Sequence, residues 1–241
     1  MDLTDKNVVI TGSTDGIGRE VADQLNAAGA NVIICGRSAD KCAAAEQAGF
    51  RTIQCDLGTP EGCDALISAY SDPMLDILIN NAGMSVETPI TADAPLDVLE
   101  QEMFLNYHAP VRLIAGFMPK LQAASEAMIV NITSGLALAP KASSPGYCAS
   151  KAALRSFTKS LRYQLADTPI HVIEALPPMV DTAMTAGRGT ARMKISPQEC
   201  AAEIISGMRN NRDDIYIGKT KLLKRVQRLS PGLADRIMIK M

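Results

Sequence analysis

The cysteine and histidine spacings typical of metal sites and disulfide frameworks are missing from this sequence. The six cysteines include no C-x-x-C pair, and the only histidines are His108 and His171. We therefore expect no zinc site and predict no bound metal. Cys35 and Cys55 lie in apolar runs, which favours buried free thiols. Cys148, next to a tyrosine, could report oxidation, but a buried thiol is the favoured interpretation.

Long apolar runs and a large net charge are also absent. No run of 18 or more apolar residues occurs, and the chain starts with a strand-like segment instead of a signal-peptide core. We therefore expect a cytoplasmic protein. The net charge of -2 argues against a nucleic-acid partner. Residues 219–241 nevertheless hold seven Lys or Arg against one Asp, so this basic tail carries +6 and the rest of the chain -8.

What remains is the composition of an ordinary globular protein. The chain has 241 residues, of which 47% are hydrophobic and 21% charged. Short apolar runs without polar alternation, typical of parallel strands buried on both faces, alternate with helical patterns. No repeat or linker interrupts them, so we predict one α/β domain over residues 1–241. Strands are expected at 7–11, 31–35, 51–55, 76–79, 126–133, 170–175 and 214–217.

A glycine-rich loop follows the first strand. It reads Gly12-Ser-Thr-Asp-Gly16-Ile-Gly18 and precedes a helical pattern at 19–28. Glycines here let the backbone approach a pyrophosphate, which the N–H groups at a helix N-terminus can bind. The spacing G-x-x-x-G-x-G departs from the familiar G-x-G-x-x-G, and a purely structural turn is the alternative. We predict dinucleotide contacts from Gly12, Ser13, Thr14, Gly16, Ile17 and Gly18.

The end of the second strand indicates which dinucleotide is bound. An acidic residue there would accept hydrogen bonds from a ribose 2′-hydroxyl, whereas this chain has glycine followed by Arg37, which suits a 2′-phosphate. We therefore expect NADP(H). Arg37 could instead be a solvated loop residue, and Arg19 could share or replace its role. At the end of the third strand, Asp56 could accept from an adenine amino group or cap the helix after Pro60.

Tyr147 and Lys151 form the pattern with the clearest chemistry. Four residues apart on a predicted helix, they share one face, and the lysine charge is expected to lower the pKa of the phenol toward the range of a general acid/base. Ser134 follows a strand and could donate to the same substrate oxygen. A surface tyrosine and a solvated lysine are the alternative. Asn106 lies within a predicted long helix at 95–121. Its polar side chain either has a functional role or forms a hydrogen bond with its own backbone.

In their order along the chain, these motifs resemble those of the short-chain dehydrogenase/reductase family. The resemblance covers nearly the whole chain and includes the second fingerprint Asn80-Asn81-Ala82-Gly83. It implies a Rossmann fold with a doubly wound, seven-stranded parallel sheet. It also implies hydride transfer between a nicotinamide and a carbonyl or secondary alcohol.

The same resemblance implies roles for single residues. Tyr147 would be the acid/base, Ser134 would hold the substrate oxygen, and Lys151 would bind the nicotinamide ribose and lower the pKa of the phenol. Asn106 would anchor a water in the proton relay. Pro178 replaces the glycine of the family's Pro-Gly element and has no N–H, which puts a backbone contact there in doubt. Further cofactor contacts are expected from Asp56, Leu57, Asn81, Ala82, Gly83, Pro177, Val180 and Thr182.

Substrate and partners are less defined. Residues 183–195 carry glycines and mixed polarity without a clear period, which is typical of a lid. The resemblance implies a homodimer or homotetramer, in agreement with apolar stripes on the predicted helices at 95–121 and 147–166. An apolar substrate pocket is suggested by the lid and by Met84, Leu136, Ala137, Leu138 and Met179.

The basic tail, residues 219–241, has two interpretations. It could lie on an anionic membrane surface, or it could pack an apolar face on the domain or on a second subunit, which we favour. It also resembles the tail of a family branch found beside cell-envelope biosynthesis functions, a hint toward lipid-like substrates. The apolar face is expected to consist of Leu222, Leu223, Val226 and Leu229.

Three functional hypotheses follow from these patterns. The first is an NADP(H)-dependent oxidoreductase acting on a largely apolar, small or medium carbonyl or alcohol. The second is a catalytically silent nucleotide-sensing regulator that has kept the fold. The third is a membrane-surface enzyme or tether that acts on a lipid-like or cell-envelope substrate. We favour the first, because the residues for catalysis are all present.

Overall fold

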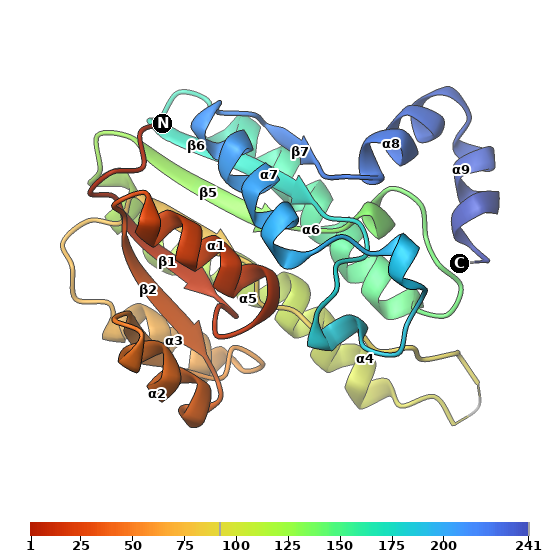
Figure 1. Cartoon of the computed structure of the whole chain (residues 1–241), viewed down its shortest axis with the longest axis horizontal. Coiled ribbons are helices and arrows are strands. Elements are labelled where there is room, and N and C mark those ends of the chain that lie inside the picture. The colour runs from red at the N-terminus through yellow and green to blue at the C-terminus, as the bar shows by residue number, and fades with distance from the viewer. Residues whose placement is uncertain (92, 241) are drawn as a thin grey trace.

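Seven parallel strands form the centre of the molecule, with helices on both faces (Figure 1). The computed structural model describes residues 1–91 and 93–240. Its sheet order is β3-β2-β1-β4-β5-β6-β7, which confirms the predicted doubly wound Rossmann sheet. The strands are β1 (Asn7–Thr11), β2 (Asn31–Gly36), β3 (Arg51–Gln54), β4 (Ile77–Asn80), β5 (Ala127–Ile132), β6 (Ile170–Leu176) and β7 (Asp214–Tyr216).

The strand order reverses between β1 and β4. From β1 the chain builds outward through β2 and β3, then returns to place β4 on the other side of β1. The register sets Val8 opposite both Val32 and Ile77. Because the connections after β1 and β4 leave in opposite directions, a crevice opens at the carboxyl ends of these strands, where ligands bind in open α/β sheets.

Two apolar layers hold the sheet between its helices. On one face, Val8 and Ile10 of β1 pack in a cluster with Leu25 and Ile204. On the other face, Val9 joins a cluster that contains Phe117. The first layer involves α1 (Gly16–Ala27), α2 (Ala39–Gln47) and α7 (Pro197–Arg209); the second involves α3 (Pro60–Ala69), α5 (Ala109–Gln122) and α6 (Pro145–Gln164).

The stretch at 95–121, predicted as one long helix, is divided into three parts. Helix α4 (Leu96–Met103) is followed by a π-helical segment, η1 (Phe104–His108), and then by α5. Pro110 offers no N–H to the carbonyl of Asn106. A π-type hydrogen bond from the N–H of Ala109 to the carbonyl of Phe104 closes the segment instead. The predicted helical stretch is therefore confirmed, and the π-helical segment within it was not predicted.

Most side chains in the apolar stripes proposed for subunit contact are buried in the core of the chain itself. Leu113, Phe117 and Leu121 of α5 are fully buried. On α6, Leu154 is 1% exposed and Leu161 6% exposed. These side chains complete the protein's own core, so they give no support to an oligomer. The homodimer or homotetramer stays a prediction.

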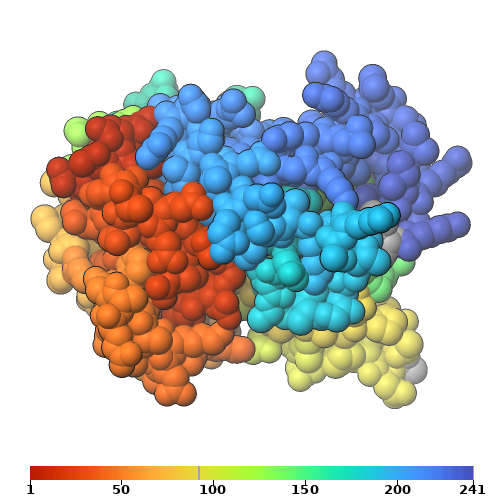
Figure 2. All heavy atoms as spheres, in the orientation of Figure 1, coloured from red at the N-terminus to blue at the C-terminus, as the bar shows by residue number. Residues whose placement is uncertain are grey.

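The C-terminal part of the chain stands at the β7 edge of the sheet. Helices α8 (Thr220–Leu229) and α9 (Pro231–Met238) pack against each other and project beyond the body (Figures 1 and 2). The last residue of the basic tail, Met241, lies outside the described residues. Across the described ranges, no helix is long and apolar enough to cross a bilayer.

Candidate active site

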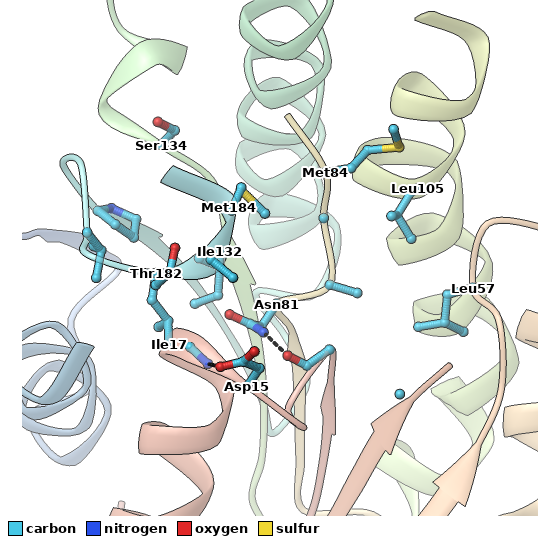
Figure 3. A pocket seen from close by; sticks show the side chains of 18 of the residues that line it. Asp15, Ile17, Leu57, Asn81, Met84, Leu105, Ile132, Ser134, Thr182 and Met184 are labelled. Atoms are coloured by element: carbon cyan, nitrogen blue, oxygen red, sulfur yellow. Dashed lines mark hydrogen bonds between the residues drawn. The ribbon is translucent and has the colours of Figure 1, made fainter. Parts of the chain in front are cut away.

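A cavity of about 390 Å³ lies over the carboxyl ends of the strands at the β1/β4 switch point. In Figure 3, Asp15, Ile17 and Thr182 lie on one side of it, Leu57 and Met84 on the other, and Asn81 between them. All the residues predicted to bind the cofactor line this cavity except Ser13 and Gly18. The lining ones are Gly12, Thr14, Gly16, Ile17, Arg37, Asp56, Leu57, Asn81, Ala82, Gly83, Tyr147, Lys151, Pro177, Val180 and Thr182.

The glycine loop is held tightly against the end of β4. Gly12 has a φ of +60°, and a Cβ there would lie 2.8 Å from the Cα of Ala82. At Gly18, a Cβ would lie 2.4 Å from Nδ2 of Asn81, which donates to the carbonyls of Thr11 and Gly12 at 2.9 Å each. A side chain at either glycine would collide with the segment after β4, so the loop requires glycine to pack there. The backbone at Gly12 and Gly16 lines the cavity, which fits a dinucleotide.

Ser13 and Gly18 belong to the glycine loop but do not line the cavity. The fully buried Ser13 donates from its hydroxyl to the carbonyl of Ile10 at 2.6 Å and accepts from the N–H of Cys35 at 3.1 Å. Its hydroxyl therefore joins β1 to β2. Neither residue lines the cavity, and their predicted cofactor contacts remain predictions.

An ion pair at the start of α1 was missed from the sequence. Asp15 lines the cavity and caps the helix, accepting from the N–H of Gly16 at 2.7 Å. Its other carboxylate oxygen lies 2.6 Å from Nζ of Lys41. The hydrogen bond with Lys41 lowers the pKa of the Asp15 carboxyl. A lysine this close offsets an acidic charge that would oppose a phosphate at the helix N-terminus.

The two arginines proposed for cofactor selection differ in their surroundings. Arg37 is exposed at the end of β2 and lines the cavity. Among the described residues it has no carboxylate within 4.0 Å. Arg19 instead pairs with Asp23 at 3.1 Å and lies over the ring of Phe50, outside the cavity lining. Arg37 is thus the arginine available to a ligand.

Asp56 does not cap the helix that follows it. The cap of α3 is Thr59, whose hydroxyl accepts from the N–H of Gly62 at 3.1 Å. Asp56 lines the cavity and accepts from the N–H of Gly58 at 3.0 Å. The capping interpretation was wrong, and the short turn that holds the carboxylate leaves it at the cavity.

Ser134, Tyr147 and Lys151 line the same cavity. Tyr147 is half-buried and Lys151 is 4% exposed. The ammonium donates to the carbonyl of Ile132 at 2.9 Å and lies 5.9 Å from the centroid of the Tyr147 ring. The alternative of a surface tyrosine with a solvated lysine is therefore wrong. Ser134 accepts from the N–H of Leu136 at 3.1 Å, which fixes its oxygen at the end of β5.

The predicted lowering of the tyrosine pKa was wrong. Burial raises the pKa of Tyr147 to about 12, and the interaction with the Ser134 hydroxyl opposes this only in part. Burial also lowers the pKa of Lys151 to about 8, while the charge of Glu102 acts in the opposite direction. Removal from solvent penalises the charged form of each group, and this effect is the largest contribution to both pKa shifts.

Asn106 is a buried link between three segments. Its Nδ2 donates to the carbonyl of Met84 at 2.9 Å and to the hydroxyl of Ser150 at 3.0 Å. Its Oδ1 accepts from the N–H of Met84 at 2.9 Å. The interpretation that this side chain bonds its own backbone was wrong. Asn106 does not line the cavity, and its place in a proton relay remains a prediction.

Glu102 is a second buried group that the sequence did not reveal. It is fully buried, and one carboxylate oxygen accepts from the N–H of Val86 at 3.0 Å. The other oxygen has no hydrogen-bond partner in the part of the chain that the structure describes. Burial raises the pKa of this carboxyl. A charged residue on the inner side of an apolar helix, between Leu99 and Met103, was the signal that could have found it.

A second cavity of about 320 Å³ adjoins the first and shares five lining residues with it: Ser134, Tyr147, Pro178, Met184 and Thr185. The predicted lid, residues 183–195, lies along both cavities. Of the expected apolar pocket residues, Leu136 and Met179 line the second cavity and Met84 the first, whereas Ala137 and Leu138 line neither.

The chain is similar to known proteins in sequence and in fold. A sequence model described as short chain dehydrogenase matches residues 6–192. A Bacillus subtilis (strain 168) protein with the name "Uncharacterized oxidoreductase DltE" is 41% identical over 224 residues, which are 89% of each chain. A short chain dehydrogenase from Burkholderia cenocepacia J2315 in complex with NADP superposes with a TM-score of 0.89 at 23% identity, over 100% of both chains. Another, from Burkholderia phymatum in complex with NAD, gives 0.84 at 20% identity, over 97% of this chain and 96% of the other.

Proposed function

Because the chain belongs to the short-chain dehydrogenase family, we propose that it is an NADP(H)-dependent oxidoreductase. It would act on a carbonyl or secondary alcohol of a largely apolar, small or medium substrate. The observation that carries the proposal is that Ser134, Tyr147 and Lys151 line one cavity together with the glycine loop. NADP(H), when bound there, would supply or accept the hydride.

Tyr147 is suited to give a proton to a carbonyl oxygen. With its pKa raised to about 12, the phenol keeps its proton at neutral pH. Proton donation to the carbonyl oxygen is the step that carbonyl reduction requires. The Ser134 hydroxyl would donate a second hydrogen bond to the same oxygen and stabilise its developing negative charge.

Lys151 would hold the nicotinamide ribose. Its ammonium has three N–H donors, one of which is used by the carbonyl of Ile132. The remaining donors can reach ribose hydroxyls in the cavity that Lys151 lines. Since Asn106 ties the segment after β4 to α6 through Met84 and Ser150, we propose that it positions Lys151 and Tyr147 relative to the cofactor.

The preference for NADP(H) rests on Arg37. The solved structures with NADP and with NAD are both of this fold, so the fold alone does not select between the two cofactors. A guanidinium at the end of β2 with no carboxylate partner among the described residues would bind a 2′-phosphate. Replacing it, as in Arg37→Gln, is expected to reduce the preference for NADPH over NADH by about 10- to 100-fold in kcat/KM.

The decisive experiment follows NADPH oxidation across a panel of ketones and quinones and NADP reduction with alcohols. Tyr147→Phe is expected to lower kcat by at least about 100-fold and to leave NADPH binding intact. Full activity in this variant would contradict the mechanism. Cofactor binding without turnover on any substrate would favour the nucleotide-sensing regulator instead.

We also propose weak contact of the basic tail with anionic membrane surfaces. The supporting observation is that Leu222 and Leu229 of α8 are 63% and 86% exposed, although that helix is rich in Lys and Arg. The cytoplasmic location and the oligomeric state stay predictions.

A further inference from the structure

The second cavity has an apolar interior that the C-terminal helices complete. Helix α8 contributes Leu223 and Val226, and α9 contributes Ile237 and Met238. Three methionines, from the lid and from the segment after β6, also line it: Met179, Met184 and Met193. Flexible methionines adapt to apolar ligands of varied shape. The volume of about 320 Å³ lies within the range of small-molecule sites, roughly 300 to 1,000 Å³.

Helices α8 and α9 lie beyond the part of the chain that matches the short chain dehydrogenase model, which ends at residue 192. The end of α9 is fastened to the body by a hydrogen bond from the N–H of Ala142 to the carbonyl of Ile239, at 3.2 Å. The two helices therefore form a wall of the cavity that the family match does not account for.

Positive charge surrounds this apolar interior. Its lining contains Lys141, Arg188 and Lys219 but only one acidic residue, Glu87. Glu87 is already paired with Lys141 at 2.8 Å. Within the described ranges, Arg188 and Lys219 have no carboxylate within 4.0 Å, and Lys219 donates to the carbonyl of Arg192. Two cations with no carboxylate within 4.0 Å in the described ranges thus line an apolar space, which favours an anionic ligand.

Arg188 is held close to the reacting group. It donates to the hydroxyl of Ser85 at 3.1 Å and to the carbonyl of Ser85 at 2.9 Å. It shares the cavity with Ser134 and Tyr147, and its charge acts to lower the pKa of the Tyr147 phenol. An anionic group bound to Arg188 would therefore sit near a carbonyl bound to Ser134 and Tyr147.

We propose that the second cavity binds a carbonyl compound with two features: an anionic group a few bonds from the carbonyl, held by Arg188, and an apolar chain that extends to α8 and α9. The inference rests on the proposed function. In the reaction, the carbonyl carbon gains a hydride from NADPH and the oxygen gains the proton of Tyr147. The products are the secondary alcohol and NADP⁺, and solvent returns the proton to the phenol.

The test compares substrates that differ in one feature. With NADPH, kcat/KM is measured for 4-oxododecanoate, its methyl ester, 4-dodecanone and 4-oxopentanoate. We expect 4-oxododecanoate to exceed 4-oxopentanoate by at least about 100-fold, because each buried methylene contributes favourably. It is also expected to exceed the ester and the neutral ketone by about 10- to 100-fold, because these lack the charge.

Variants locate the two features in the protein. Arg188→Gln is expected to lower kcat/KM for 4-oxododecanoate by about 10- to 100-fold more than it lowers kcat/KM for 4-dodecanone, with partial recovery in Arg188→Lys. Leu223→Gln is expected to remove the advantage of the long chain. Arg192→Gln on the same lid and Leu229→Gln on the same helix are the matched controls, since neither side chain lines the cavity.

The outcomes separate this inference from the proposed function. Equal rates for the acid, the ester and the neutral ketone would overturn the inference while supporting the oxidoreductase. If no substrate is reduced, calorimetric titration of the NADPH-loaded wild type and Arg188→Gln with 4-oxododecanoate decides. Binding that depends on Arg188 would uphold the ligand class while the proposed function fails, and the absence of binding would overturn both.

Discussion

Burial sets the protonation of the site residue by residue. Lys151 carries its charge at neutral pH although burial lowers its pKa to about 8, and the nearby charge of Glu102 helps to keep that pKa from falling further. Glu102 is itself costly to ionise, since burial raises the pKa of its carboxyl. The two groups are therefore linked, and a change in one shifts the titration of the other.

Glu102→Gln is the change that tests this link. The amide can still accept from the N–H of Val86, but it has no charge to raise the pKa of Lys151. Activity that needs the ammonium falls as the pH rises through the pKa of Lys151, which is about 8 in the wild type. In the variant this decline is expected at lower pH. The measurement is the rate of NADPH oxidation as a function of pH.

Glu100→Gln is the matched control for this experiment. Glu100 lies on the same helix, α4, and is exposed. Its replacement changes the net charge equally and is expected to leave the pH profile in place, because solvent screens its charge. Identical profiles for Glu102→Gln and the wild type would show that Lys151 does not sense this carboxylate.

The sequence predicted which side chains lie together at the candidate site but not their protonation. Tyr147 and Lys151 are local in sequence, so helical spacing alone places them on one face. Their pKa values depend on burial by segments distant in the chain, which no local pattern records. Glu102 was missed for the same reason: its only hydrogen-bond donor among the described residues, the N–H of Val86, lies on a loop before the helix.

The loop after β1 depends on glycine in a way that substitution can measure. Gly12→Ala would place a Cβ 2.8 Å from the Cα of Ala82, in a residue with a φ of +60°. We expect a loss of about 2 to 4 kcal/mol in the free energy of unfolding, from the strained φ and the backbone contact together. NADPH binding should weaken as well, because the loop must move. Denaturant unfolding and fluorescence titration measure the two effects.

Gly49→Ala separates the contact from the conformational strain. Gly49 has a φ of +89°, but nothing lies within 4 Å of the added Cβ. Its expected cost is about 1 to 2 kcal/mol from the backbone conformation alone, and NADPH binding should not change. If both alanine variants weaken NADPH binding equally, the close approach of the loop to Ala82 is not what shapes the site.

The segment around η1 has a backbone geometry that the apolar periodicity of the sequence does not predict. An apolar pattern at helical spacing runs through 95–121, and it cannot distinguish α-helical from π-helical hydrogen bonds. Pro110 and Asn106 were visible in the sequence, but the partners of Asn106 are Met84 and Ser150, which lie 22 and 44 residues away. Such long-range pairing requires the fold to be known first.

Asn106→Ala is expected to destabilise the protein strongly. It removes the hydrogen-bond partner of both backbone groups of Met84 and of the Ser150 hydroxyl. Buried polar groups left without partners should cost about 2 to 4 kcal/mol in total. Asn26→Ala, at an exposed position on α1, is the control and should stay within about 0.5 kcal/mol of the wild type. Equal unfolding free energies for the two variants would exclude a structural role for the Asn106 side chain.

For the whole molecule, the sheet was more predictable than its surroundings. Apolar runs followed by glycine or polar residues marked all seven strands, and the observed ends differ from the expected ones by at most one residue. The function of apolar helix faces was not predictable in this way. Leu154 and Leu161 looked available to a partner but complete the core, while Leu223 and Val226 of the basic tail line a cavity.

Part of the apolar surface of the basic tail is exposed to solvent. Leu229 is 86% exposed and Leu233 is 49% exposed, and neither lines one of the two cavities described above. Residues 219–241 carry seven of the chain's Lys and Arg against one acidic residue. Apolar side chains next to a concentration of positive charge are the combination that binds anionic bilayers, with about 1 kcal/mol from each basic residue at the surface.

We therefore expect the full-length protein to co-sediment weakly with vesicles of phosphatidylglycerol and phosphatidylcholine at low salt. Binding should be lost at high salt, which screens the charges, and on neutral vesicles. Leu229→Gln combined with Leu233→Gln should reduce it several-fold without changing NADPH binding. Tyr163→Gln removes an equally exposed large side chain from α6 and should have no effect. Sedimentation that is insensitive to salt and to the leucine changes would refute a contact made by the tail.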